Sequence, residues 1–287
     1  MPRRIILHAG FHKTGTSSVQ QVLRANRAIL KPELAMRLKG QMKGLMHATR
    51  GYSTWRDPFT LAKATRRFGA VLDGLALMPR RVLVISAEEL SGHLPGRDRL
   101  KDYGAAPILL QRFSEEISAR FPKAEQAIYF STRDPDAWLR SAYWEHVKSS
   151  SMTLDYVAFV KVYGQAVDFG KIISTTRRTI QADVYDTSLE SCGDLPLGPA
   201  DPLLDLCDIS TDLRKKIIPQ PAKNQRMNDA VLLALLDANR AYADRDERKA
   251  AKHLILAEAN KNVRQTKILR TKIHSSNSHP TFTYGRR

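Results

Sequence analysis

The sequence predicts an α/β protein of the P-loop type: a three-layer sandwich with a mainly parallel central sheet and a helical C-terminal extension. Three observations support this prediction. Short, continuous apolar runs alternate with segments of helical period, as in βαβ units whose strands are covered on both faces. The first apolar run leads into a glycine loop and then a helix. The 287 residues, 43% of them hydrophobic, are enough for one large core.

Four apolar segments are predicted to be strands, and the clearest is the continuous run that begins at Arg81. The strands are 4–8, 81–86, 127–131 and 182–185, and the helices are 16–30, 107–121, 136–148, 154–167, 228–243 and 247–272. Residues 31–80 have a weak, basic pattern that predicts helices and loops. Because the turn-rich stretch 191–202 is too short for a linker, we expect one domain over 1–245. A basic helical extension with a frayed tail is expected over 246–287.

Composition excludes several classes of protein. The best apolar run, which begins at Val231, stops at Asp237, well short of the roughly 20 residues of a membrane-spanning helix. The apolar stretch near the N-terminus is too short for a secretory signal. Two cysteines, Cys192 and Cys207, exclude a disulfide scaffold and a cysteine-built zinc site. We therefore expect a cytoplasmic protein without a membrane span.

Positive charge is concentrated at the two ends of the chain. The formal net charge is +17. Residues 1–50 contain ten basic residues and one acidic residue, and residues 246–287 contain ten basic and three acidic residues. This distribution suggests an anionic partner such as a nucleotide, a nucleic acid, an acidic glycan or a membrane surface. Solubilising charge on helix faces would give the same composition. Charge alone does not decide between them.

A phosphate-binding loop is predicted between the first strand and the first helix. In Gly10-Phe11-His12-Lys13-Thr14-Gly15-Thr16-Ser17 the glycines let consecutive N–H groups turn into one concavity, and the helix that follows adds its positive end. Compared with the common nucleoside-triphosphatase loop, position 16 is Thr where Lys is expected. The lysine stands at position 13 instead. This shift directs its ammonium group to the loop mouth rather than to a terminal phosphate.

A second constellation follows the third predicted strand. Arg133 comes directly after the carboxyl end of that strand, and Ser141 lies eight residues further on, about two turns into the next helix. An arginine fork and a hydroxyl form a natural clamp for a phosphate group. A helix-start turn with a local salt bridge to Asp134 would produce the same residues. The phosphate loop earlier in the chain favours the clamp.

Together these two motifs resemble those of the sulfotransferases that use 3′-phosphoadenosine 5′-phosphosulfate (PAPS). Lys13-Thr14-Gly15-Thr16-Ser17 is similar to that family's 5′-phosphosulfate loop, in the form found in carbohydrate and bacterial enzymes. Arg133 and Ser141, with their eight-residue separation, are similar to its 3′-phosphate motif. The resemblance is anchored in residues 4–20 and 126–148 and extends loosely to 245. It says little about the acceptor.

The resemblance implies a role for each matching residue. Lys13 would contact the leaving phosphate oxygen and act as a catalytic residue. The backbone of 14–18 and the hydroxyls of Thr16, Ser17 and Ser18 would hold the 5′-phosphate. The implied cofactor-binding residues in this loop are His12, Lys13, Thr14, Gly15, Thr16, Ser17 and Ser18. Arg133 and Ser141 would hold the 3′-phosphate, which distinguishes PAPS from ATP. No metal is implied, because the lysine and the N–H groups neutralise the developing charge.

The general base is less well marked in the sequence. Glu88 is the preferred candidate, because it follows the second predicted strand at the same sheet edge as the two motifs. His12, His8 and Glu33 are alternatives, although a histidine at a strand end is more often buried and hydrogen-bonded. Aromatic residues of the 136–148 helix could stack on adenine or belong to the core; they are Trp138, Tyr143 and Trp144. A third PAPS contact is expected in the basic loop 223–226.

The predicted activity is transfer of a sulfuryl group from PAPS to a hydroxyl or amine of a carbohydrate or small metabolite. Three alternatives remain at this stage: another P-loop kinase or phosphotransferase, a non-catalytic nucleotide-binding protein, and a basic nucleic-acid binder. Nucleic acid is the less favoured partner, because no zinc-finger or RNP-type signature is present. The basic residues of the last helix could bind an anionic ligand or form a solvated face; they are Arg248, Lys249, Lys252, Lys261, Arg264, Lys267, Arg270 and Lys272.

Overall fold

The computed structural model describes residues 1–75, 81–98, 100–221 and 228–276, with 262–276 as backbone only. Within these residues the chain forms one five-stranded sheet, and every pairing in it is parallel. The strands are β1 (Arg4–His8), β2 (Leu34–Leu38), β3 (Val82–Ser86), β4 (Glu125–Thr132) and β5 (Asp183–Ser188), in the order β2-β3-β1-β4-β5. The predicted P-loop-type α/β sandwich is confirmed in this architecture.

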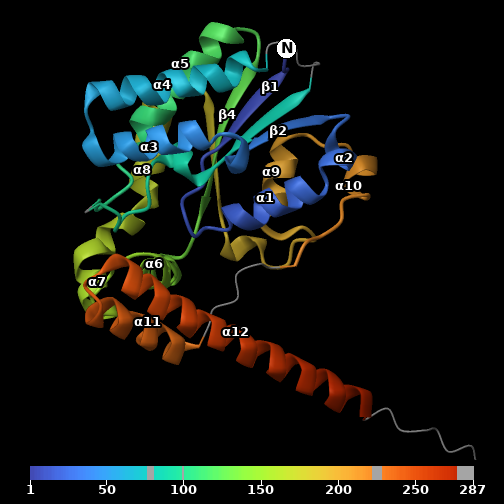
Figure 1. Ribbon diagram of the computed structural model, residues 1–287. Coiled ribbons are helices and arrows are strands. Elements are labelled where there is room, and N and C mark those ends of the chain that lie inside the picture. Colours follow the sequence, from blue (N-terminus) through green and yellow to red (C-terminus); the bar gives the residue numbers. More distant parts are fainter. Residues whose placement is uncertain (76–80, 99, 222–227, 277–287) are drawn as a thin grey trace, which may run out of the picture. The chain divides into compact units, whose positions relative to one another are not determined.

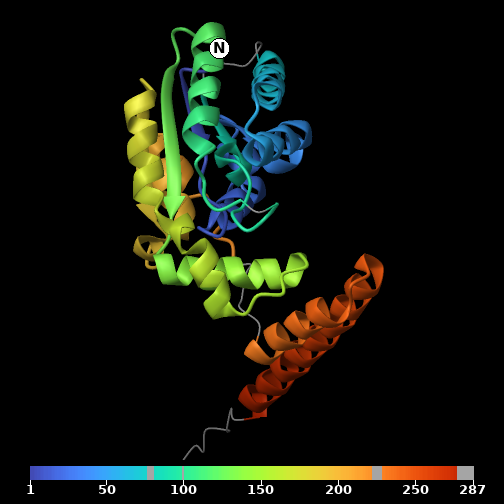
Figure 2. The same ribbon diagram turned by 90° about the vertical axis from the view of Figure 1, so that its left-hand side faces the viewer.

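Helices cover both faces of the sheet (Figure 1). On one face lie α1 (Thr16–Ala25), α2 (Arg27–Leu30), α9 (Asp201–Leu206) and α10 (Thr211–Arg214). The other face, towards the viewer in Figure 2, carries α3 (Lys43–Trp55), α4 (Pro58–Asp73), α5 (Ala106–Arg120) and α8 (Phe169–Thr179). The inner strands are buried on both sides, which explains why their sequences are continuous apolar runs rather than alternating ones.

Successive side chains of the inner strands point alternately into two cores, one on each face of the sheet. Ile6 of β1 and Val84 of β3 belong to the cluster that packs against Val19 and Leu23 of α1. Neighbouring side chains such as Ile5 are fully buried on the opposite face. The two cores hold the carboxyl ends of all five strands at one edge of the sheet. In parallel α/β sheets this edge is where ligands bind.

Several elements were missed in the sequence, among them β2, α8 and the short helices α9 and α10. The strand β2 lies in the stretch predicted as helices and loops, because its apolar run is short and is interrupted by Arg37. The helix α8 has an amphipathic pattern but is rich in Thr and Arg. The predicted helix 16–30 is two helices that meet at Asn26, and the predicted helix 154–167 is α7 (Tyr156–Tyr163) followed by a 3-10 turn.

The chain divides into two compact units. The first contains 1–143 and 156–224, and the second contains 144–155 and 225–287. The helix α6 (Pro135–Ser149) runs from one into the other, and α11 (Asp229–Ala241) and α12 (Arg245–Ser276) pack side by side in the second. The unit that holds the last helix therefore begins before the predicted boundary at 245/246.

A buried lysine explains this division. Lys252 of α12 donates hydrogen bonds to the carbonyls of Val147 and Ser150, at 2.6 and 2.7 Å, and to Oδ1 of Asn239 in α11. Asn239 donates to the same Val147 carbonyl. One of the basic residues predicted to bind an anionic ligand is thus a structural contact. The side chains of 264, 267, 270 and 272 lie outside the described residues, as does the predicted contact loop 223–226.

Among the described residues, none of the helices has the length and apolar character needed to cross a membrane.

Candidate functional site

The loop after β1 is shaped by small residues and positive backbone angles. A Cβ on Gly10 would lie 2.1 Å from the Ser131 Oγ, so only glycine fits there without a shift. Lys13 and Gly15 have φ angles of 68° and 94°. Such angles turn the chain sharply, and Lys13 is one of few non-glycine residues here to adopt one. The loop therefore curls back before α1 begins.

Two threonines of the loop point inward. The Thr14 hydroxyl donates a 2.6 Å hydrogen bond to the Phe11 carbonyl and contacts the Ser131 Oγ at 2.9 Å. The Thr16 hydroxyl also donates to the Phe11 carbonyl, at 3.2 Å. These contacts hold the curl of the loop from inside. They tie it to Ser131 near the end of β4, two residues before Arg133.

The first turn of α1 offers backbone donors at the loop mouth. Gly15 is the N-cap residue and has no side chain to accept a hydrogen bond from this turn. Ser17 is exposed and Ser18 is half-buried, whereas Thr14 and Thr16 are buried. The positive end of the helix thus lies beside two accessible hydroxyl groups. This combination suits a phosphate group.

Arg133 joins the two sequence motifs. Its Nη1 donates a hydrogen bond of 3.1 Å to the backbone carbonyl of Lys13. Its Nε is buried and has no hydrogen-bond acceptor among the described residues, since Glu190 Oε1 lies 3.9 Å away. Trp138 makes a second link, because its Nε1 donates to the His12 carbonyl at 2.7 Å. The structure therefore brings the loop and the arginine to one place, and leaves one guanidinium nitrogen without an acceptor.

Ser141, the remaining member of the second motif, lies on α6. Asp134 begins this helix, where its Oδ1 accepts a 2.9 Å hydrogen bond from the N–H of Ala137. Ser141 is half-buried, and no hydrogen bond joins it to Arg133 among the described residues. Trp138 and Tyr143 are buried, which agrees with the core alternative rather than with stacking on adenine.

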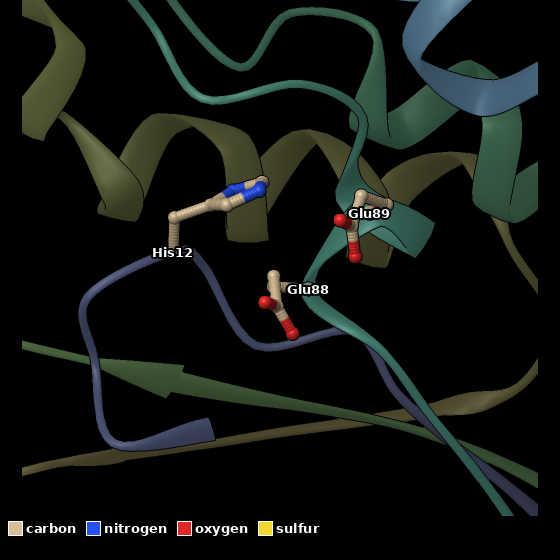
Figure 3. A group of neighbouring side chains, drawn as sticks. All are labelled: His12, Glu88 and Glu89. Atoms are coloured by element: carbon tan, nitrogen blue, oxygen red, sulfur yellow. The ribbon is translucent and has the colours of Figure 1, made fainter. Parts of the chain in front are cut away.

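A cluster of charged residues occupies the other side of the loop. Lys39 follows β2, and its Nζ lies 2.7 Å from Glu88 Oε1 and 2.6 Å from Glu89 Oε1. Gln20 of α1 donates to the second oxygen of Glu88 at 3.3 Å. His12 lies opposite the two carboxylates, as Figure 3 shows. Because β2 and β3 are neighbours, the residues that follow them meet at the sheet edge.

The electrostatics of this cluster shift the pKa values of the two carboxylates in opposite directions. Burial alone would raise both pKa values, but the positive charge of Lys39 and its hydrogen bond lower the pKa of Glu88 below its ordinary value. Burial and the neighbouring Glu88 raise the pKa of Glu89. Burial opposes the charge of Lys39, yet the two carboxylates raise its pKa. Glu88 therefore loses its proton before Glu89 as the pH rises.

His12 is held as a packing residue of the loop. Its N–H donates to the Tyr103 hydroxyl at 3.2 Å, and its Nδ1 lies 3.2 Å from the same oxygen. Burial lowers the pKa of His12 to about 3 and raises that of Tyr103 well above its ordinary value. Both are neutral near pH 7. A neutral His12 leaves Lys39 as the main cation beside Glu88.

The other two candidate bases have structural roles. His8 is fully buried between Ser86 and Ser131, with its Nδ1 2.8 Å from the Ser86 Oγ, and burial lowers its pKa to about 4. Glu33 precedes β2 and therefore lies at the amino edge of the sheet, where its carboxylate accepts two hydrogen bonds from Ser210. Glu33 was a wrong candidate, because the strand that follows it was not recognised.

A metal ion is the other possible occupant of the carboxylate cluster. Ligand atoms of His12, Glu88 and Glu89 all lie within 4.8 Å of one another. The Lys39 ammonium, however, already sits within hydrogen-bond distance of both carboxylates. A divalent ion there would have to displace it against strong repulsion. The arrangement fits an internal ion pair better than a metal centre.

Comparison with known proteins adds little. No family model matches the sequence, and no curated protein matches it. One similar solved structure belongs to the PezAT chromosomal toxin-antitoxin system of Streptococcus pneumoniae; the match has a TM-score of 0.32 and 10% identity, and covers 84% of this chain and 86% of that one. At this level of similarity the match supports no conclusion about function.

Proposed function

We propose that the chain transfers a sulfuryl group from PAPS to a hydroxyl or amine acceptor. The observation that carries the proposal is the 3.1 Å hydrogen bond between Arg133 and the Lys13 carbonyl, because it joins the phosphate loop to the predicted 3′-phosphate clamp. The unsatisfied Nε of Arg133 supports a second anion contact beside it. A cytoplasmic location stays a prediction.

The chain's residues fit an in-line displacement at sulfur. The acceptor oxygen or nitrogen forms a bond to sulfur while the bond from sulfur to the 5′-phosphate oxygen breaks, and the acceptor's proton passes to a base. Lys13 and the N–H groups of the first turn of α1 stabilise the charge that grows on the leaving oxygen. Arg133 and Ser141 hold the 3′-phosphate.

We assign the base to Glu88. It is the carboxylate whose pKa is lowered, so it is ionised and able to accept a proton near pH 7. Lys39 and Gln20 each contact one of its oxygens and fix its orientation. Glu89 is the less suitable acceptor, because its side chain is buried.

The competing P-loop phosphotransferase is disfavoured by two features of the loop. Position 16 carries no lysine for a terminal phosphate, and the Thr16 hydroxyl donates into the loop rather than toward its mouth. A nucleotide-binding protein without catalysis shares every binding residue with the sulfotransferase. Turnover of PAPS in the presence of acceptors separates these two.

The direct test is calorimetric binding of 3′-phosphoadenosine 5′-phosphate (PAP) against ADP. We expect PAP to bind at least tenfold more tightly than ADP, and Arg133→Gln to remove that preference. Arg140→Gln changes an exposed arginine of α6, the helix that follows Arg133, and should leave the preference intact. Hydrogen bonds to charged groups contribute about 1.5–3 kcal/mol, or roughly 10- to 100-fold in affinity. Equal binding of PAP and ADP would refute the proposal.

A further inference from the structure

A basic cavity lies beside β2, outside the residues assigned above. It has a volume of about 320 Å³ and is formed by residues of β2, the start of α3 and the second half of α4; its lining is Arg37, Gln41, Met42, Lys43, Gly44, Leu45, Arg67, Ala70, Val71 and Gly74. This volume falls at the lower end of the range of about 300–1,000 Å³ for small-molecule sites. None of these lining residues is acidic.

Its three basic side chains have no carboxylate partner among the described residues. Arg37 is half-buried, while Lys43 and Arg67 are exposed, and in the described parts of the chain none of the three is ion-paired with a carboxylate. Arg120, which packs near the same helix α4, is paired with both Asp73 and Glu116. The cavity therefore carries an uncompensated positive charge, and burial together with nearby Arg27 lowers the pKa of Arg37.

The backbone adds donors to the same cavity. The first three residues of α3, from Lys43 to Leu45, line it, and their N–H groups have no acceptor within the helix. The N-cap residue, Met42, provides no side-chain acceptor. Gly44 leaves the backbone open, and a Cβ placed there would lie 3.9 Å from the Arg67 guanidinium. Three cations and a free helix start thus surround one space.

Two residues that line the cavity are close in sequence to Lys39, which contacts the proposed base Glu88. Arg37 and Gln41 are each two residues from Lys39, the residue that holds Glu88. Two residues span at most about 7 Å. The cavity and the residue that holds the proposed base thus belong to one short segment of the chain.

We propose that the acceptor is an anionic molecule, and that its carboxylate, sulfate or phosphate group binds in this cavity between Arg37, Lys43, Arg67 and the first turn of α3. This inference rests on the proposed sulfuryl transfer and names the class of its acceptor. The cavity orients the acceptor by its charge and leaves its hydroxyl to Glu88. A neutral acceptor of equal size loses this contact.

The first test measures backbone amide shifts while inorganic sulfate is titrated into the full chain saturated with PAP, at constant ionic strength. We expect saturable shifts at the amides of Lys43, Gly44 and Leu45. The double substitution Arg37→Gln/Arg67→Gln should weaken this binding at least fivefold. Arg66→Gln changes the neighbouring exposed arginine, which does not line the cavity, and should leave the binding unchanged. Absence of shifts at 43–45, or equal binding to the double variant, would overturn the site.

The second test uses two sugars that differ only in one carboxylate, methyl β-D-glucuronide and methyl β-D-glucoside. The glucuronide should shift the same three amides, and the glucoside should not at equal concentration. Identical behaviour of the two would overturn the acceptor assignment. The proposed function fails separately, in the calorimetry of PAP against ADP, so a chain that binds PAP but shows no shifts at 43–45 refutes this inference alone.

Discussion

The guanidinium of Arg133 and the backbone carbonyl of Lys13 lie 3.1 Å apart and share a hydrogen bond, although 120 residues separate them in sequence. The contact exists because β1 and β4 are adjacent parallel strands, so the segments after them leave the sheet side by side. It fixes the loop through the backbone of Lys13 and does not involve the lysine side chain. The backbone and side-chain roles of Lys13 can therefore be tested apart.

Lys13→Ala is expected to reduce PAPS turnover by about 100-fold or more, because it removes a preorganised positive charge from the leaving oxygen. Lys13→Gly should lose the same activity. Its free energy of unfolding should stay within about 1 kcal/mol of wild type, because glycine adopts the positive φ of this position without strain. Turnover is measured as PAP formed, and stability by denaturant unfolding. Near-normal turnover in either variant would exclude the role of Lys13.

Lys39→Met is expected to move the acidic limb of the pH–rate profile to higher pH by at least about one unit. As the proposed base, Glu88 would act in its ionised form, so the rate should rise as pH increases through its pKa. The charge of Lys39 and its hydrogen bond now hold that pKa below its ordinary value against burial. Without the ammonium, burial prevails and the pKa rises. Lys39→Arg should keep the wild-type limb, and an unmoved limb in Lys39→Met would show that Lys39 does not tune Glu88.

Gly10→Ala is expected to destabilise the chain by about 1–3 kcal/mol, because its Cβ would lie 2.1 Å from the Ser131 Oγ. Removing that oxygen in Gly10→Ala/Ser131→Ala should recover part of the loss. Gly40→Ala is the matched control, since a Cβ there meets nothing within 4 Å. Denaturant unfolding of the four chains measures the coupling. Simple additivity of the two substitutions would contradict the close approach of the loop to β4.

Stability should fall as pH decreases from about 6.5 towards 4. Burial lowers the pKa of His8 from 6.5 to about 4, so the unfolded chain binds a proton that the folded chain does not. The stability from neutral His8 is complete above pH 6.5 and declines by about 3 kcal/mol as the pH falls to 4. His8→Gln should flatten this dependence, and His47→Gln, at an exposed position of α3, should not. A parallel decline in wild type and His8→Gln would contradict this account.

Local pattern predicted the parts of the fold that are locally determined. The strands β1, β3 and β4 are continuous apolar runs, and the loop between β1 and α1 is marked by its glycines. The edge strand β2 has little such signal, because Arg37 interrupts it. Missing β2 left Glu33 among the candidate bases, although it precedes the strand and lies at the amino edge of the sheet.

The carboxylate cluster required the tertiary structure. Lys39 meets Glu88 and Glu89 only because β2 pairs with β3, and the order of strands is not encoded in any short segment. Tyr103, which holds His12, comes from a loop with no marked pattern. The one sequence signal for Lys39 would have been its place directly after an edge strand. The spacing of Arg133 and Ser141, by contrast, was available from the sequence.

The most direct test of the account is a crystal structure of the full chain with PAP. The account predicts the 3′-phosphate within hydrogen-bond distance of the Arg133 guanidinium and the Ser141 hydroxyl, with the 5′-phosphate against the backbone of 14–18 and Lys13. A complex in which PAP binds elsewhere, or in which Arg133 contacts neither phosphate, would contradict it.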